Sequence, residues 1–199
     1  MEKNRLEAFS DGVMAVIITI MVLELKVPHG QDLSVLAPLW STWISYVLSF
    51  IYVGIYWNNH HHMLQVVRSV NGGILWTNLH LLFWLSLLPF TTGWMGENHF
   101  ARWPTMLYGF DLLACAVAWY LLQTCLIEHH GADSLLARAV RGDAKLKLSV
   151  VLYFGGLGAA GLGWPTVGIL LFAIVALFWI VPDRRMERAL AEAQSKRQQ

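Results

Sequence analysis

The chain alternates long apolar runs with short polar stretches, and each of six runs approaches the length that a helix needs to cross a bilayer. About 20 consecutive apolar residues span the hydrocarbon as an α-helix. The pattern therefore predicts six membrane-spanning helices joined by short loops. The runs are residues 8–27, 37–57, 72–92, 104–127, 147–163 and 165–182.

The second half of the chain has less regular spacing. Only Trp164 separates the last two runs, and Pro165 begins the second of them. Proline is favoured at the first position of a helix, so these runs should form a tight helical hairpin. The loop at 128–146 has room for one small amphipathic helix. The charged segment 183–199 should form a short cytoplasmic tail. No stretch is long enough for a separate soluble domain, so we expect residues 1–199 to form one domain.

Composition places the whole chain in a membrane. Hydrophobic residues make up 56% of the 199 positions and charged residues only 14%, whereas charged residues make up about a quarter of a soluble domain. The ten tryptophans agree, because tryptophan is enriched at membrane interfaces. The sequence thus predicts an all-α integral membrane protein in contact with lipid. Its net charge of +1 and scattered basic residues do not suggest a nucleic-acid partner.

The distribution of Lys and Arg predicts the orientation. With a cytoplasmic N terminus, twelve Lys and Arg residues fall in the inner segments, and only Lys26 and Arg102 fall in the outer ones. Basic residues accumulate in cytoplasmic loops. We therefore expect a multi-pass protein with both termini in the cytoplasm.

Polar residues mark the inner end of the first run. Arg5, Ser10 and Asp11 precede or begin an otherwise apolar helix, and an ionisable group at membrane depth is costly unless it has a partner. The second run returns to the same depth and ends in YWNNHHHM, which includes Trp57 and His60. This arrangement predicts an Asp–His or Asp–Trp hydrogen bond that ties the first two helices together. Arg5 should cap the same network.

The remainder of the first run has a helical stripe of branched apolar residues. At about 100° per residue, Val16, Ile20, Leu23 and Val27 fall on one face, with Thr19 beside them. Such a stripe is usually a packing surface. Spacing alone does not show whether these side chains line a pore or pack against other helices.

Two further acids lie in or near the spans. Glu24 follows the stripe at the outer end, where it would either join an acidic ring that concentrates cations or pair with Lys26. Asp111 lies about two turns into the fourth run. An intramembrane acid is a functional candidate by default, and a structural hydrogen bond is an equal alternative.

Two short motifs resemble the signature of the transmembrane protein 175 family, the potassium channels of endolysosomes and bacteria. They are R-x-x-x-F-S-D at the start of the first run and W-x-x-H at the end of the second. The six runs and the cytoplasmic termini also match. The single copy of the motif is similar to that of bacterial single-repeat members. The motif residues are Arg5, Phe9, Ser10, Asp11, Trp57 and His60.

The resemblance implies a homotetramer in the bacterial plasma membrane, with the first helix of each chain around a central pore. It implies that Val16, Ile20 and Leu23 form the constriction, and that the Thr19 hydroxyl contributes to selectivity. Val16 is smaller than the Ile or Leu usual in the family, which would make the gate wider there. The expected function is passive, potassium-preferring cation permeation, with K⁺ as the permeant ion, no cofactor and no enzymatic activity.

Other chemistry has less support in the sequence. Consecutive residues of a helix point in different directions, so the three histidines at 60–62 cannot all ligate one ion, and we expect no tightly bound metal. No common catalytic motif is evident. The alternative function is a proton-coupled secondary transporter that uses Asp11, His60 and Asp111 as a relay. The charges of transporters, however, usually lie near the midplane of repeated helix bundles.

Overall fold

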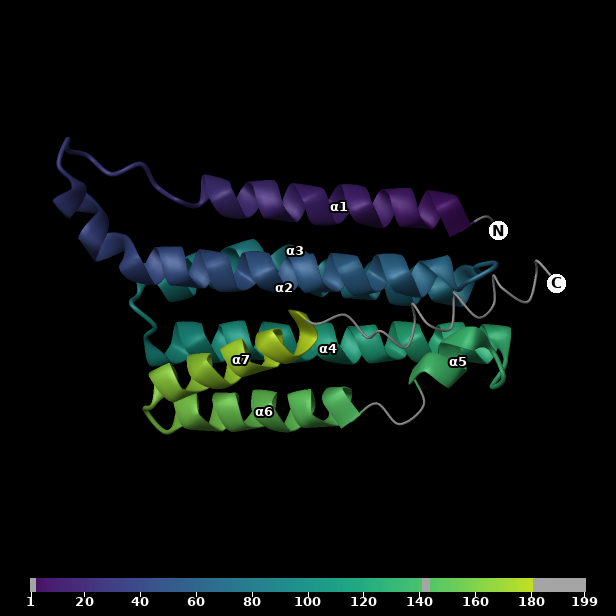
Figure 1. Ribbon diagram of the computed structural model, residues 1–199. Helices are drawn as coiled ribbons and strands as arrows, with labels where there is room; N and C mark the ends of the chain where they lie inside the picture. Colours follow the sequence, from purple (N-terminus) through teal and green to yellow (C-terminus); the bar gives the residue numbers. More distant parts are fainter. Residues whose placement is uncertain (1–2, 141–143, 181–199) are drawn as a thin grey trace.

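The computed structural model describes residues 3–140 and 144–180, and this part of the chain folds into seven α-helices and one 3₁₀ helix, without strands (Figure 1). The all-α class is therefore confirmed for these residues, whereas the predicted tail at 183–199 lies outside them. The elements are α1 (Lys3–Leu23), η1 (Leu33–Leu39), α2 (Trp40–Gln65), α3 (Gly72–Glu97), α4 (Arg102–His130), α5 (Leu135–Val140), α6 (Ala144–Gly161) and α7 (Pro165–Ile180).

The six predicted runs correspond to six long helices of unequal length. By length and composition, α1, η1 with α2, α3 and α4 can each cross a membrane. Helix α7 has 16 residues, and α6 has 18 residues with Lys145 and Lys147 in its first turn. Among the described residues, length and composition therefore support four crossings, and six crossings remain a prediction.

The bounds of α1 differ from those of the first apolar run. The helix begins at Lys3, so the polar residues at the start of the run belong to it, and it ends at Leu23. Val27, predicted to continue the apolar stripe, lies beyond this end. A residue that precedes proline is disfavoured in the helical conformation, and Pro28 follows Val27 directly.

Helices α1 to α4 lie side by side along the long direction of the molecule (Figure 1). Helix α3 packs against α1, α2 and α4, and the α6–α7 hairpin packs against α4 on the side away from α1. We call the end of the bundle where α1 begins and α2 ends the foot end; it is on the right in Figure 1. Because α1 contacts only α2 and α3 substantially, one of its faces stays free.

The predicted hairpin of the last two runs is confirmed. Helices α6 and α7 are joined by residues 162–164, with Gly163 at φ 93°, a left-handed conformation that glycine adopts without steric cost. The two helices then pack closely. A Cβ on Gly168 would lie 2.8 Å from the backbone oxygen of Gly156.

The close approach predicts a specific sensitivity to side-chain volume. Gly168→Ala should destabilise the fold by about 1–3 kcal/mol, because the added methyl forces α6 and α7 apart. The melting temperature of the purified protein in detergent measures this effect. Gly158→Ala is the matched control, because a Cβ there meets no atom within 4 Å. Equal melting temperatures for the two variants would contradict the close packing.

Candidate pore helix and its polar foot

Helix α1 has one buried and one exposed face. Its buried residues recur every three or four positions and face α2 and α3. The predicted stripe lies on the other face, where Val16 is 54% exposed, Ile20 41% and Leu23 79%. Thr19 is also exposed, and its hydroxyl donates to the backbone oxygen of Val16 at 2.8 Å. The stripe is therefore not a packing surface within its own chain. The buried residues are Leu6, Ser10, Met14, Ile17 and Met21.

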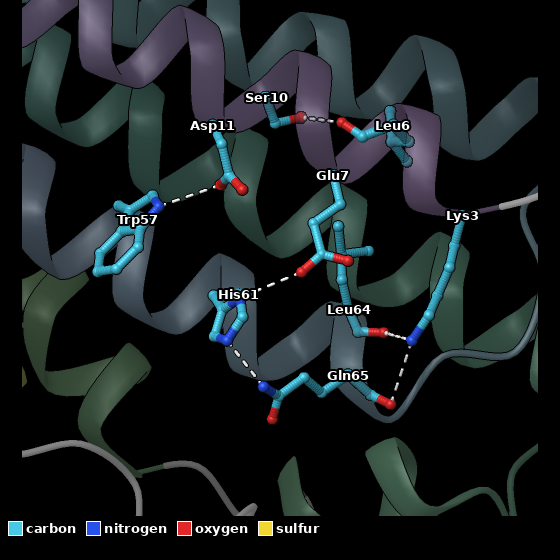
Figure 2. A network of polar contacts seen from close by, with 9 residues as sticks. All are labelled: Lys3, Leu6, Glu7, Ser10, Asp11, Trp57, His61, Leu64 and Gln65. Carbon is cyan, nitrogen blue, oxygen red and sulfur yellow. Dashed lines mark hydrogen bonds and ion pairs between the residues drawn. The ribbon is translucent and has the colours of Figure 1, made fainter.

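The predicted hydrogen bond between Asp11 and the end of the second span is present, with tryptophan as its donor. The Nε1–H of Trp57 on α2 donates to Oδ1 of Asp11 at 3.0 Å (Figure 2). Asp11 is partly buried, and Trp57 is 45% exposed. This contact joins the first turns of α1 to the last turns of α2.

Two further contacts extend this pairing toward the foot end. Oε1 of Glu7 lies 3.1 Å from Nδ1 of His61, and the Lys3 ammonium donates to the backbone oxygen of Leu64 at 2.8 Å (Figure 2). The pairs are regularly spaced. Each pair lies about four residues earlier on α1, and about four residues later on α2, than the pair before it. Antiparallel helices pair in this way, because residues four apart lie on the same face.

This regularity is a signal that the sequence analysis missed. Once Asp11 is paired with Trp57, Glu7 is one turn earlier on α1, and His61 is one turn later on α2. Glu7 and His61 should therefore lie opposite each other on the two antiparallel helices. We call these polar contacts of α1 at the foot end the polar foot. It contains more contacts than the motif residues alone.

A second group of contacts joins α1 to α3. The Asn78 amide on α3 donates to Oγ of Ser10 at 2.9 Å, and its Oδ1 lies 2.8 Å from Nε2 of His60. Ser10 in turn donates to the backbone oxygen of Leu6 at 2.9 Å. Ser10, His60 and Asn78 are all fully buried. His60 therefore joins the foot through Asn78 rather than through Asp11.

Asn78 was not among the predicted site residues. It lies about two turns into the third run, at the end of the bundle where Ser10 and His60 also lie. A buried amide needs partners for both its donor and its acceptor. Matching the depth of this amide to that of Ser10 and His60 would have found the contact.

Two motif residues face away from these contacts. Arg5 is exposed and forms none of the foot's hydrogen bonds within the described ranges, so the predicted cap is not found. Phe9 is 53% exposed. Both residues lie on the side of α1 that carries the apolar stripe, because positions 5, 9, 12, 16, 20 and 23 follow helical spacing.

At the opposite end of α1, Glu24 does not pair with Lys26. The Lys26 ammonium instead lies 2.6 Å from Oε1 of Glu97, the last residue of α3. The hydrogen bond with Glu97, together with the charges of Glu97 and Glu24, raises the pKa of Lys26 above its ordinary value. Lys26 therefore stays protonated at neutral pH. Glu24 is exposed, and its Oε2 lies 3.7 Å from the position that a Cβ on Gly93 of α3 would take, so its side chain lies next to α3.

Asp111 is buried away from the foot. Its side chain is 2% exposed, and its Oδ2 accepts a hydrogen bond from Thr91 on α3 at 3.0 Å. Asp11, His60 and Asp111 thus belong to three separate contacts in the described part of the chain. This separation gives no support to a relay through all three.

Comparisons with known proteins agree with the features of α1 and α2. Residues 5–89 match the family described as the endosomal/lysosomal potassium channel TMEM175. The chain is 50% identical over 192 residues to a protein of Chryseobacterium sp. that is named a potassium channel, covering 96% of this chain and 100% of the relative. It is 32% identical over 153 residues to a Streptomyces collinus protein with the same kind of name, covering 70% and 74% of the two chains.

A solved structure is also similar over most of the chain. It is the crystal structure of a lysosomal potassium-selective channel TMEM175 homolog from Chamaesiphon minutus. The TM-score is 0.78 at 26% sequence identity, covering 91% of this chain and 97% of the other. The likeness extends beyond the matched residues 5–89 to the α4, α6 and α7 part of the bundle.

The foot contacts predict that Asp11 holds α1 in place. Asp11→Ala should destabilise the protein by about 1–3 kcal/mol, because the Trp57 N–H loses its acceptor. We expect a lower melting temperature and less assembled protein on size-exclusion chromatography. Asp11→Asn is the control for the melting temperature, because its amide oxygen can still accept from Trp57. A stable, fully assembled Asp11→Ala protein would contradict the anchoring role.

Asn78 should matter as much, although it lies outside the motif. Asn78→Leu leaves His60 without its partner and Ser10 without its donor in a buried site, at a cost of about 1–3 kcal/mol for each group. Thermal unfolding in detergent measures the loss. Asn58→Leu is the matched control, because Asn58 forms no hydrogen bond within the described residues. Similar unfolding of the two variants would rule out a special role for Asn78.

Proposed function

Because this chain belongs to the TMEM175 family, we propose that it is a passive potassium channel in which four copies place their α1 helices around a central pore. The names of its bacterial relatives and of the structurally similar Chamaesiphon protein support the choice of ion. The 50% identity to the Chryseobacterium protein extends over nearly the whole chain. The chain is a multi-pass membrane protein, and relatives of this kind are channels rather than enzymes.

One structural observation carries the proposal most strongly. The apolar stripe of α1 is exposed, although the same helix is held to α2 and α3 by its other faces. One helix cannot enclose a path for ions, and identical chains close such a path most simply as a symmetric ring. A ring of α1 helices would bring the four stripes together at the axis.

The stripe determines how such a pore would conduct. Val16, Ile20 and Leu23 offer no charge or carbonyl to a permeating ion, so an ion at this point must shed water against hydrocarbon. Such an apolar constriction gates by drying. Thr19 would contribute a ring of hydroxyls between the Val16 and Ile20 rings, and Val16 would leave the pore wider than a larger side chain would.

The polar foot has a mechanical role in this proposal. Contacts on two sides of α1, to α2 through Asp11 and to α3 through Ser10, fix the rotation of the helix about its own axis. The stripe then stays directed away from the rest of the chain. We further propose that the foot end and both termini are cytoplasmic in the plasma membrane, and that Glu24 lies at the outer mouth.

The proposal requires no cofactor or bound metal, since potassium is the permeant ion. A proton-coupled transporter is less well supported, because its three candidate residues do not share a contact. Asp111 lies on α4, which does not pack substantially against α1, and it is hydrogen-bonded to Thr91.

Substitutions in the stripe test the pore directly. Leu23→Ala should raise the current by widening the constriction. Ile20→Asn should raise it by making the ring polar, and should also reduce the preference for potassium over sodium. Reversal potentials under bi-ionic potassium and sodium, recorded in reconstituted bilayers, measure both effects. Ile18 is partly buried on another side of the helix, so Ile18→Val serves as the control.

Thr19 tests the selectivity ring separately. Thr19→Ala should shift the reversal potential toward zero with little change in assembly, because it removes one hydroxyl and little volume. Thr19→Ser keeps the hydroxyl and should retain the preference for potassium. Wild-type currents and reversal potentials in the stripe and Thr19 variants alike would mean that this face contacts lipid or protein instead of ions.

A further inference from the structure

A histidine on the outward face of α3 has an unused hydrogen-bond donor. His80 is exposed, and its Nε2 accepts from the Nε1–H of Trp84 at 2.9 Å. An indole N–H can only donate, so the neutral imidazole of His80 carries its proton on Nδ1. This Nδ1–H has no partner among the described residues.

The depth of His80 makes this donor costly in lipid. Trp76 and Trp94 are exposed on α3 and are 18 residues apart, or about 27 Å along the helix axis. Tryptophans at such a spacing mark the two interfaces of a hydrocarbon layer about 30 Å thick. His80 lies one turn inside Trp76, where lipid tails provide no acceptor, so the donor needs an acceptor from protein.

The hydrogen bond between Ser10 and Asn78 gives the level of His80 relative to α1. Both helices run away from the foot end, so residue n of α1 lies level with residue n + 68 of α3. His80 is therefore level with Gly12, one residue's rise from Asp11. Asp11 uses Oδ1 to accept from Trp57, and its Oδ2 accepts no hydrogen bond from the described residues.

Within one chain these two groups face different directions. Asp11 points toward α2, while His80 lies on the exposed side of α3. A rotation about the membrane normal, which relates the chains of a ring, leaves every residue at its own depth. If the outward face of α3 contacts the next chain, the residues that it meets there lie at its own level.

The flank of α1 next to Asp11 has the shape that such a contact needs. Ala8 and Ala15 are exposed there, and small residues let another helix approach closely. The same offset places Ala8 level with Trp76 and Ala15 level with Phe83, and both aromatic side chains are exposed on α3, at 75% and 54%. Large side chains on one surface thus lie at the levels of small ones on the other.

We propose that the outward face of α3 binds the α1 flank of the neighbouring chain, and that His80 donates its Nδ1–H to Asp11 of that chain. The inference rests on the proposed ring of four chains. It gives Asp11 two partners, namely Trp57 of its own α2 and His80 of the next subunit. The motif carboxylate would then tie the pore helix to its own chain and to the ring.

Cross-linking between two different chains tests this interface. In a background with Cys115 and Cys125 replaced by alanine, one tagged chain carries Ala15→Cys, and a second chain with a different tag carries Phe83→Cys. A short thiol cross-linker should give a heterodimer band only when the two chains are co-expressed. Ala15→Cys with Leu177→Cys is the control pair, because Leu177 is 63% exposed on α7, away from α1 and α3.

Substitution of His80 tests the hydrogen bond itself. His80→Leu should lower the ratio of tetramer to smaller species at least about five-fold on size-exclusion chromatography with light scattering. Ser86→Leu is the control at another exposed position of α3, because the Ser86 hydroxyl is already bonded to the backbone oxygen of Phe83. If His80 faces lipid instead, leucine will leave the ratio unchanged or raise it, which overturns the proposal.

The outcomes separate this inference from the proposed function. A tetramer that conducts potassium but gives no Ala15–Phe83 band overturns the interface and leaves the channel intact. A wild-type chain that neither assembles nor conducts overturns the proposed function and the interface together.

Discussion

The polar contact between α1 and its neighbours is the constraint on which the rest of the structure depends. Association of helices in lipid gains little from burying apolar side chains, because lipid tails are as apolar as leucine. Hydrogen bonds at membrane depth supply direction instead. Asp11 with Trp57, and Ser10 with Asn78, hold α1 from two sides. Together they determine which face of the helix remains uncovered.

The uncovered face of α1 is apolar, whereas the exposed face of an ordinary amphipathic helix is polar. Val16 and Ile17 are adjacent and similar in chemistry, yet Val16 is 54% exposed and Ile17 3% exposed. The foot contacts, and not the hydrophobicity of the two side chains, make this difference. A stripe of this kind can face lipid, a neighbouring chain or a pore, and all three accept branched apolar side chains.

Much of the fold, and part of the foot, could be predicted from the sequence. The Asp11–Trp57 bond was predictable because two adjacent runs must bring their polar ends to one depth. Asn78 was missed because hydropathy gives the extent of α3 but not which of its residues face α1. The extension of the stripe to Val27 was wrong, because apolar periodicity continues past Leu23, where α1 ends.

Polar side chains at membrane depth distinguish a surface that faces protein from one that faces lipid, whereas apolar side chains do not. The exposed apolar residues of α3 would be satisfied by lipid, but the Nδ1–H of His80 would not. On α1, the second carboxylate oxygen of Asp11 is unused at nearly the same level. Because ring symmetry preserves depth, such unmatched donors and acceptors indicate which faces of neighbouring chains meet. Val16, Ile20 and Leu23 of the stripe have no side-chain donor or acceptor that needs a partner. A face directed toward the axis of a hydrophobic pore requires this property.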